Sequence, residues 1–443
     1  MAQSAPAAAV SNIYNTPELR DKIMFTLVCL VIYRVGAHIT APGIDVVALT
    51  DFFANQGKGG LLGLYDLFVG GGLSHATVFA LGIMPYISAS IFMQIAGAVM
   101  PTVEKMQKDE EGRKQVTQWT RYITVVLAVV QGWGFALFTS SLENAVVHPG
   151  FGFKVQMVLV LTTGAMFVMW LGEQITERGL GNGASLIIFF SIVERFWPGI
   201  FSTVGFVKTQ VVGPFSLVML GLVMVGVVAG TVAITIAARR VMIQIPQRTM
   251  ARGRQREAAK NFIPLRVNAA GVMPIIFASS VIVVPGAIAS FSQNPMANRM
   301  AEMISPGTWL YYILSAILIV FFTYFYTSII FNPVDISENL KKQGGFIPGV
   351  KPGARTAEYI DHVVSRITFT GAIFLTFIAL LPVFIADLIN VPFQFGGTSL
   401  LIVVGVALDT LAQVNQHLLL RKYDGFMKKG RVRFRGRGPS GAY

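Results

Sequence analysis

Charged residues are scarce in this sequence. Only 13% of its 443 residues are Asp, Glu, Lys or Arg, whereas 53% are hydrophobic. The mean hydropathy of +0.62 lies outside the range of an ordinary soluble domain of this length. This composition excludes a soluble globular protein and predicts a chain that crosses a membrane many times.

Cysteine pairs, metal-ligand clusters and catalytic motifs are also missing. Cys29 is the single cysteine, so neither an intrachain disulfide nor a thiolate metal site can form. The five histidines have no ligand spacing, and no P-loop or HExxH motif occurs. The run from Gly179 to Gly183 lacks the lysine of a phosphate-binding loop and predicts a tight turn. We therefore expect no cofactor and no enzyme activity, so energy for transport must come from a partner or a gradient.

Ten stretches are apolar over about 20 residues, the length that crosses a bilayer. The predicted fold is all-α with ten transmembrane helices, at residues 23–39, 76–100, 119–139, 155–172, 184–205, 215–237, 269–291, 309–331, 367–386 and 398–415. The fifth contains Glu194, Arg195 and Pro198, and the tenth is short and holds Asp409, so either is expected to tilt or to end early. Most of the 35 lysines and arginines fall in alternate loops, which places both termini in the cytoplasm.

The chain divides into two halves of five spans each, residues 1–205 and 206–415. A basic tail follows at residues 416–443. An odd number of spans per half means that the second half is inverted. The second span of each half contains proline: Pro85 in one, Pro274 and Pro285 in the other. Proline is common in membrane helices in general. Interrupted segments at corresponding positions nevertheless indicate the functional site of a transport protein, so we place the pathway between these two helices.

The chain before the second span is broken as well. An apolar piece, Leu61 to Val69, is too short to cross, and Gly70 to Gly72 follow it. A polar joint at Ser74 and His75 leads into the span, where Pro85 is expected to remove a helical hydrogen bond. Irregular backbone at membrane depth must be buried in protein or line a cavity. The stretch therefore predicts a half-helix, a glycine hinge and a full helix around a cavity.

The middles of the spans are nearly free of ionisable residues. This argues against an ion-coupled transporter of a small solute, although that class also explains ten spans and inverted halves. An intramembrane enzyme is a third alternative, and it would lose activity on mutation of one acidic or serine residue. The apolar side chains that fill the middles are, taken singly, most simply explained as lipid-facing or packed. As a set they could form a hydrophobic constriction: Ile83, Ile87, Ile187, Ile188, Ile275, Ile276 and Ile402.

Two long cytoplasmic loops, residues 239–268 and 332–366, form a basic face together with the tail. The first loop alternates in polarity around the basic turn ARGRQR, which predicts a hairpin with Pro246 in an edge strand. Membrane topology and anionic lipids explain a basic face without any partner. The length and folding of the loops favour a docking surface, and RNA is a candidate partner because phosphate binding requires Lys and Arg.

Five motifs occur in order along this frame. They are TVFALGIMPYISASIFMQ at 77–94, WLGEQITERGLGNGASLII at 170–188, LRVNAAGVMPIIFASS at 265–280, FNPVDISENLKKQGGFIPGVKPG at 331–353 and FGGTSLLIVV at 395–404. On these motifs the chain resembles the bacterial form of the SecY family of protein-conducting channels, over nearly its whole length. The resemblance implies a channel that moves unfolded polypeptides across, or sideways into, the bacterial plasma membrane.

The resemblance also implies roles for particular positions. An hourglass pore would be closed by an apolar ring at Ile83, Ile87, Ile188, Ile276 and Ile402, with Val272 as a further member. A plug that swings away would occupy about residues 64–74, with plug and hinge residues Leu67, Phe68, Gly70, Gly71, Gly72, Leu73 and Ser74. A lateral gate for signal sequences and membrane segments would include Pro85, Gln94, Asn268 and Pro274.

The basic loops would receive the ribosome or the SecA motor through Arg248, Arg252, Arg254, Arg256, Lys341, Lys342, Lys351 and Arg355. The family further implies the small membrane subunits SecE and SecG, and contact with membrane lipids. One departure is Lys351 in the motif GVKPG, where the bacterial family usually has arginine. Lysine keeps the charge without the bidentate fork, which bears on motor coupling. Glu194 and Arg195 are further departures, expected to affect the limits of the fifth span and not the pore.

Overall fold

The structure, a computed structural model, describes residues 17–55, 60–142, 144–208, 213–244, 261–291, 294–388 and 397–429. The first half contains α2 (Pro17–Gly36), α3 (Val46–Asn55), α4 (Leu61–Val69), α5 (Met84–Val99), α6 (Pro101–Lys108), α7 (Glu110–Ser141), α8 (Phe151–Arg178) and α9 (Gly183–Lys208). The second half contains α10 (Pro214–Ile236), β1 (Ala238–Ile243), β2 (Asn261–Arg266), α11 (Met273–Phe291), α12 (Pro295–Met303), α13 (Trp309–Ile330), α14 (Pro333–Lys342), α15 (Ala354–Leu388) and α16 (Gly397–Lys429).

In the described part of the chain the fold is all-α apart from one hairpin, and one long helix overlaps each of the ten expected spans. Within the described ranges these are α2, α5, α7, α8, α9, α10, α11, α13, α15 and α16. In the same part of the chain, seven helices are by themselves long and apolar enough to cross a membrane. The number is eight if α5 and α6, which meet at a bend of 107°, count as one span.

The second span differs from its prediction because Pro85 begins α5 and does not interrupt it. Residues 78–83 form turns, and the helix starts at Met84 with Pro85 in its first turn. Pro274 likewise occupies the first turn of α11, and only Pro285 lies inside that helix. A proline in the first turn costs no hydrogen bond, because the backbone N–H groups there have no acceptor within the helix.

α15 and α16 extend furthest beyond their predicted spans. α15 begins at Ala354, well before the apolar residues that start at 367, and α16 continues without a break to Lys429. The tail predicted to begin at residue 416 is therefore helical in its first part. Hydropathy marks where a span leaves the lipid, whereas Leu, Lys and Arg allow the helix to continue into water.

The hairpin predicted between residues 239 and 268 is present over β1 and β2, whereas Pro246 and the predicted turn ARGRQR lie outside the described residues. β1 and β2 pair antiparallel, with Arg240 opposite Pro264, which a two-stranded ribbon tolerates because both strands are edges. Gln244 and Phe346 exchange backbone hydrogen bonds, so the hairpin is joined to the second basic loop. Val241, Leu265, Ile347, Ile360 and Val363 form a small separate core. The two loops thus fold together as one body.

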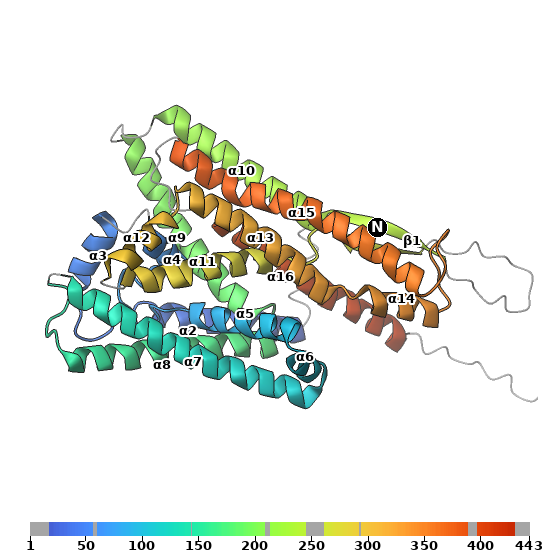
Figure 1. Cartoon of the computed structure of the whole chain (residues 1–443), viewed down its shortest axis with the longest axis horizontal. Coiled ribbons are helices and arrows are strands. Elements are labelled where there is room, and N and C mark those ends of the chain that lie inside the picture. Colours follow the sequence, from blue (N-terminus) through green and yellow to red (C-terminus); the bar gives the residue numbers. More distant parts are fainter. Residues whose placement is uncertain are drawn as a thin grey trace, which may run out of the picture.

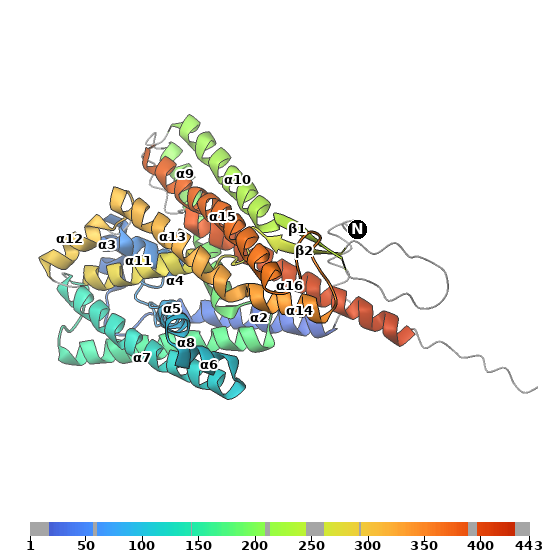
Figure 2. The same ribbon diagram turned by 45° about the vertical axis from the view of Figure 1, so that its right-hand side comes forward.

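The main core lies between the two halves. In both views α7 and α8 run along one side and α10 and α15 along the other, with α4 and α11 between them (Figures 1 and 2). The short helix α4 contacts α9 and α11. The outward faces are apolar and exposed, for instance Val218, Leu222 and Val225 on α10, as expected for surfaces that face lipid.

Candidate functional site

Two helices of the site begin in the same way. Gly82-Ile83-Met84-Pro85 leads into α5, and Gly271-Val272-Met273-Pro274 leads into α11. Both glycines have positive φ angles, +54° at Gly82 and +64° at Gly271, a conformation that favours glycine. Ile83 and Val272 therefore take equivalent positions ahead of the two helices. This repeat agrees with the inverted halves. It is the sequence pattern that relates α5 to α11.

The six residues expected to form the apolar ring all lie in the main core. Each is at most 6% exposed, and Ile402 on α16 is completely buried. Ile87, Ile188 and Ile276 also line a cavity of about 260 Å³. This cavity is bounded by α5, α7, α8, α9, α11 and α13.

Part of the cavity lining is polar. Its lining includes Gln94 and the pair formed by Arg121 and Glu173. Arg121 on α7 binds Glu173 on α8 in a bidentate manner, with Nε to Oε1 at 3.0 Å and Nη2 to Oε2 at 2.8 Å. Such paired donors fix the carboxylate more rigidly than a single contact. The cavity is therefore a half-polar vestibule that ends on apolar side chains.

The short helix α4 lies beyond the isoleucines. It ends at Gly70, which takes the left-handed conformation and closes the helix through hydrogen bonds from its N–H to Asp66 and Leu67. Leu67, Phe68, Leu73 and Ser74 are buried. The region expected as a plug thus has a helix over Leu61–Val69, and residues 70–74 form the turn after it.

The order of contacts along α9 places the isoleucines between cavity and plug. Ser185 and Ile188 line the cavity. One turn further, Ser191 lies against Gly70, where an added methyl group would come within 3.2 Å of the Ser191 Cα. α11 shows the same order, since Ile276 lines the cavity and Gly286 packs against Leu61 of α4.

The residues expected at the lateral gate are only partly brought together. α5 and α11 are in contact, and Ser280 Oγ on α11 lies 3.9 Å from Met84 Sδ on α5. Gln94 lines the cavity, but Asn268 does not. Asn268 is buried, and its Oδ1 accepts no hydrogen bond within the described ranges. Pro85 and Pro274 shape the helix starts.

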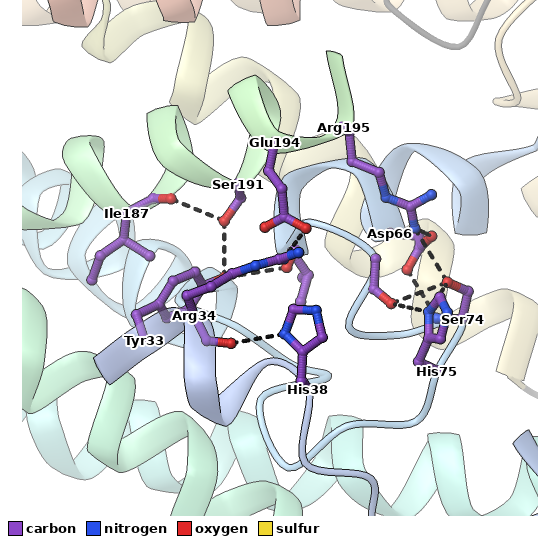
Figure 3. A network of polar contacts seen from close by, with 12 residues as sticks. Tyr33, Arg34, His38, Asp66, Ser74, His75, Ile187, Ser191, Glu194 and Arg195 are labelled. Carbon is purple, nitrogen blue, oxygen red and sulfur yellow. Dashed lines mark hydrogen bonds and ion pairs between the residues drawn. The ribbon is translucent and has the colours of Figure 1, made fainter. Parts of the chain in front are cut away.

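A charged cluster that the sequence did not predict lies beside the plug. Arg195 on α9 forms an ion pair with Asp66 on α4, and Glu194 forms one with Arg34 on α2 (Figure 3). The expectation that Glu194 and Arg195 affect only the limits of the fifth span is therefore wrong. Asp66 and Arg195 are 129 residues apart. The only sequence signal was the presence of two charges in an apolar span, and no local pattern identifies the residues that pair with them.

The docking residues are exposed where the structure describes them: Lys341, Lys342, Lys351 and Arg355. Lys342 pairs with Glu338 at 3.8 Å, and Arg355 pairs with Glu358 at 3.6 Å. Arg248, Arg252, Arg254 and Arg256 lie outside the described residues. No group of three His, Cys, Asp or Glu side chains in the described part of the chain could hold a metal ion.

Comparison with known proteins agrees with this architecture. The sequence model of the SecY family matches residues 77–411. Protein translocase subunit SecY of Aquifex aeolicus is 43% identical over 425 residues, 94% of this chain and 98% of its own length. The subunit of that name from Escherichia coli is 42% identical, with 95% and 96% covered.

Solved structures show the same fold. A structure of a protein conducting channel aligns with a TM-score of 0.66 at 16% identity, covering 94% of this chain and 95% of that one. Sec61 in the canine ribosome-channel complex from the endoplasmic reticulum aligns with a TM-score of 0.63, also at 16% identity, with 94% and 95% covered.

Proposed function

The chain belongs to the SecY family, and from this premise we propose that it is the pore-forming subunit of a protein translocase. It conducts unfolded polypeptides across the membrane and releases apolar segments sideways into lipid. It is a channel and not a catalyst. The observation that carries the proposal is the order of cavity, isoleucines and plug along α9 and α11.

The physical properties of the ring residues suit this task. A narrow apolar constriction loses its water when empty, and so excludes ions. Around a moving chain it seals against any side chain without binding one tightly, because dispersion contacts are individually weak and nonspecific. A plug formed by α4 is supported by the packing of Val69 against Gly82, which precedes Ile83. Displacement of α4 would open the way.

The partners follow from the family and from the basic face. We propose that the hairpin and the second basic loop receive a ribosome or the SecA motor, which supplies the driving energy, and that SecE and SecG accompany the chain. Support comes from the shared core of the two loops and from the exposed Lys341, Lys351 and Arg355. The membrane is proposed to be the bacterial inner membrane with both termini in the cytoplasm, because Lys and Arg concentrate in alternate loops.

Besides the ten spans and inverted halves, the charged cluster is a feature that an ion-coupled transporter would share. Its charges are paired within the protein, Asp66 with Arg195 and Arg34 with Glu194, so none is left to bind a coupling ion. Family membership also favours the channel. Saturable uptake of a labelled small solute into vesicles would restore the transporter alternative.

Site-specific cross-linking tests the proposed path. In a Cys29→Ser background, single cysteines are placed at Ile83 or Ile276, and a secretory precursor is arrested midway by a folded domain. We expect cross-links at both positions only when the precursor carries a signal sequence and the driving partner is present. A cysteine at Ile317, which is 60% exposed on α13, is the matched control and should form none.

The proposed path is wrong if arrested precursor is demonstrably engaged and neither pore position reacts. Reaction at Ile317 equal to that at Ile276 would point to a route along the lipid-facing side of the protein. Either result would contradict the route between α5 and α11 without contradicting translocation across the membrane.

A further inference from the structure

The carboxylate of Asp66 links the plug to its own hinge. Asp66 lies in the last turn of α4, and its side chain is only 8% exposed. Its Oδ1 accepts hydrogen bonds from the backbone N–H groups of Leu73 at 3.1 Å and Ser74 at 2.9 Å. These contacts lie within residues 61–74, so they hold α4 and the hinge together as one unit.

The other oxygen of the same carboxylate reaches outside that unit. Asp66 Oδ2 forms an ion pair with Nη2 of Arg195 on α9, and that nitrogen also donates to Ser74 Oγ at 3.2 Å (Figure 3). The guanidinium lies over Gly71, where an added methyl group would come within 2.6 Å of it. Gly71 has a φ of +89°, so the absence of a side chain there serves both the turn and the approach of Arg195.

The neighbours of Arg195 on α9 also make polar contacts. Ser191 contacts Tyr33 of α2, and Glu194 contacts Arg34 of α2. Ser191 Oγ lies 2.8 Å from the Tyr33 hydroxyl, which donates to the carbonyl oxygen of Val69 at 3.2 Å. Residues three or four apart share one face of a helix. The end of α4 therefore rests on a polar face formed by α9 and supported by α2.

Displacement of the plug must break the Asp66–Arg195 pair. The hydrogen bonds of Asp66 to Leu73 and Ser74 can move with the plug, but its contact with Arg195 crosses to a different helix. Removing one partner of a buried ion pair is strongly destabilising, because it leaves an uncompensated charge. The closed position is thus favoured over intermediate positions in which the carboxylate is neither paired nor hydrated.

We propose that the Arg195–Asp66 ion pair is a latch that holds the plug closed, with Arg195 as the positioning residue. This inference rests on the proposed function as a gated channel. It adds a specific determinant of the resting state, encoded by two charges that otherwise stand unexplained in an apolar region.

The latch is tested with the purified translocase complex reconstituted into vesicles without precursor. The variants are Arg195→Gln, Asp66→Asn and the two combined. Asp66→Asn keeps an oxygen that can accept from Leu73 and Ser74. We expect each single variant to raise the resting ion leak severalfold, and the combined variant to leak no more than the leakier single variant, because the pair is already broken. Arg299→Gln removes an exposed arginine of α12 as a matched control, and its leak should equal that of the wild type.

Conservative replacement separates latching from simple structural support. Arg195→Lys keeps the charge but loses the planar fork, so its leak should lie between those of the wild type and Arg195→Gln. If Arg195→Gln fails to assemble, Asp66→Asn decides the case, and a wild-type leak in correctly assembled Asp66→Asn would overturn the latch.

Two further results overturn the proposal. One is an unchanged leak in correctly assembled Arg195→Gln, and the other is a leak in the combined variant that equals the product of the two single effects, which would show that Arg195 and Asp66 act independently. Precursor translocation by the wild type is measured in the same vesicles. If the wild type translocates and only the variant pattern fails, the latch is wrong; if the wild type does not translocate, the proposed function itself fails.

Discussion

Val69, the last residue of α4, packs directly against Gly82, which immediately precedes Ile83. A methyl group added at Gly82 would lie 3.0 Å from Val69 Cγ2. Gly82 also has a φ of +54°, in the left-handed region. The turn that starts α5 and the end of the plug are therefore fitted to each other, and a change in one should move the other.

Replacement of Gly82 by alanine is expected to loosen the closed plug. The left-handed conformation costs an L-residue about 1–2 kcal/mol, and the new methyl group presses on Val69. If displacement of the plug relieves this strain, the displaced state becomes about 5–30-fold more populated. Resting ion conductance in planar bilayers measures the effect. Gly226→Ala on α10, where nothing lies within 4 Å, is the control, and equal conductance in the two variants would contradict the fit.

Removal of ring side chains should weaken the seal independently of the plug. Ile83→Gly with Ile276→Gly widens the constriction and removes apolar surface that keeps it dry. The resting conductance should rise, and the pore should pass larger ions than before. Ile317→Gly, at a residue that is 60% exposed, should leave both quantities unchanged. Unchanged conductance in the double variant would count against these residues as the constriction.

The vestibule depends on the pair formed by Arg121 and Glu173. The Glu173 side chain is only 12% exposed, so Arg121→Ala leaves a nearly buried carboxylate without its partner. Such a group costs about 1–3 kcal/mol, and the thermal midpoint in detergent should fall by a few degrees. The second variant, Arg121→Ala with Glu173→Gln, removes the charge and should recover part of the loss. A larger fall in the double variant would show that the side chains act through packing.

The large features of this fold follow from sequence because they rest on local patterns. Hydropathy places each long helix, and alternation with a basic turn places the hairpin. The repeated proline also marks α5 and α11, which are in contact in the structure. Its physical effect was misjudged, since hydropathy cannot tell a proline inside a helix from one that starts it. The turns at Gly82 and Gly271 decide this, and they depend on tertiary contacts.

The contacts of the plug illustrate what sequence could not supply. Gly70 to Gly72 predict a break, and the structure has it there. The partner of Asp66 is on a helix more than a hundred residues away, and an ion pair has no spacing rule across that distance. The predicted apolar ring could be picked out only with the help of the family. No local pattern marks its isoleucines, and only family resemblance separated them from residues such as Ile187 and Ile275, which are equally buried.

Lys351 offers a test of the basic face that leaves the pore untouched. Its side chain is exposed, and its carbonyl oxygen accepts a hydrogen bond from Thr356 Oγ1 at 2.9 Å, so the backbone at this position is fixed while the side chain is free to engage a partner. Arginine would add a planar fork that binds carboxylate or phosphate through two hydrogen bonds. Lys351→Arg should therefore tighten binding of the motor or ribosome to reconstituted complex, and Lys351→Gln should weaken it.

Lys342→Arg, at a side chain already paired with Glu338, is the control and should change affinity less. Since resting conductance depends on the ring and plug, it should be the same in all three variants; equal affinity of Lys351→Arg and Lys351→Gln would remove this residue from the docking surface.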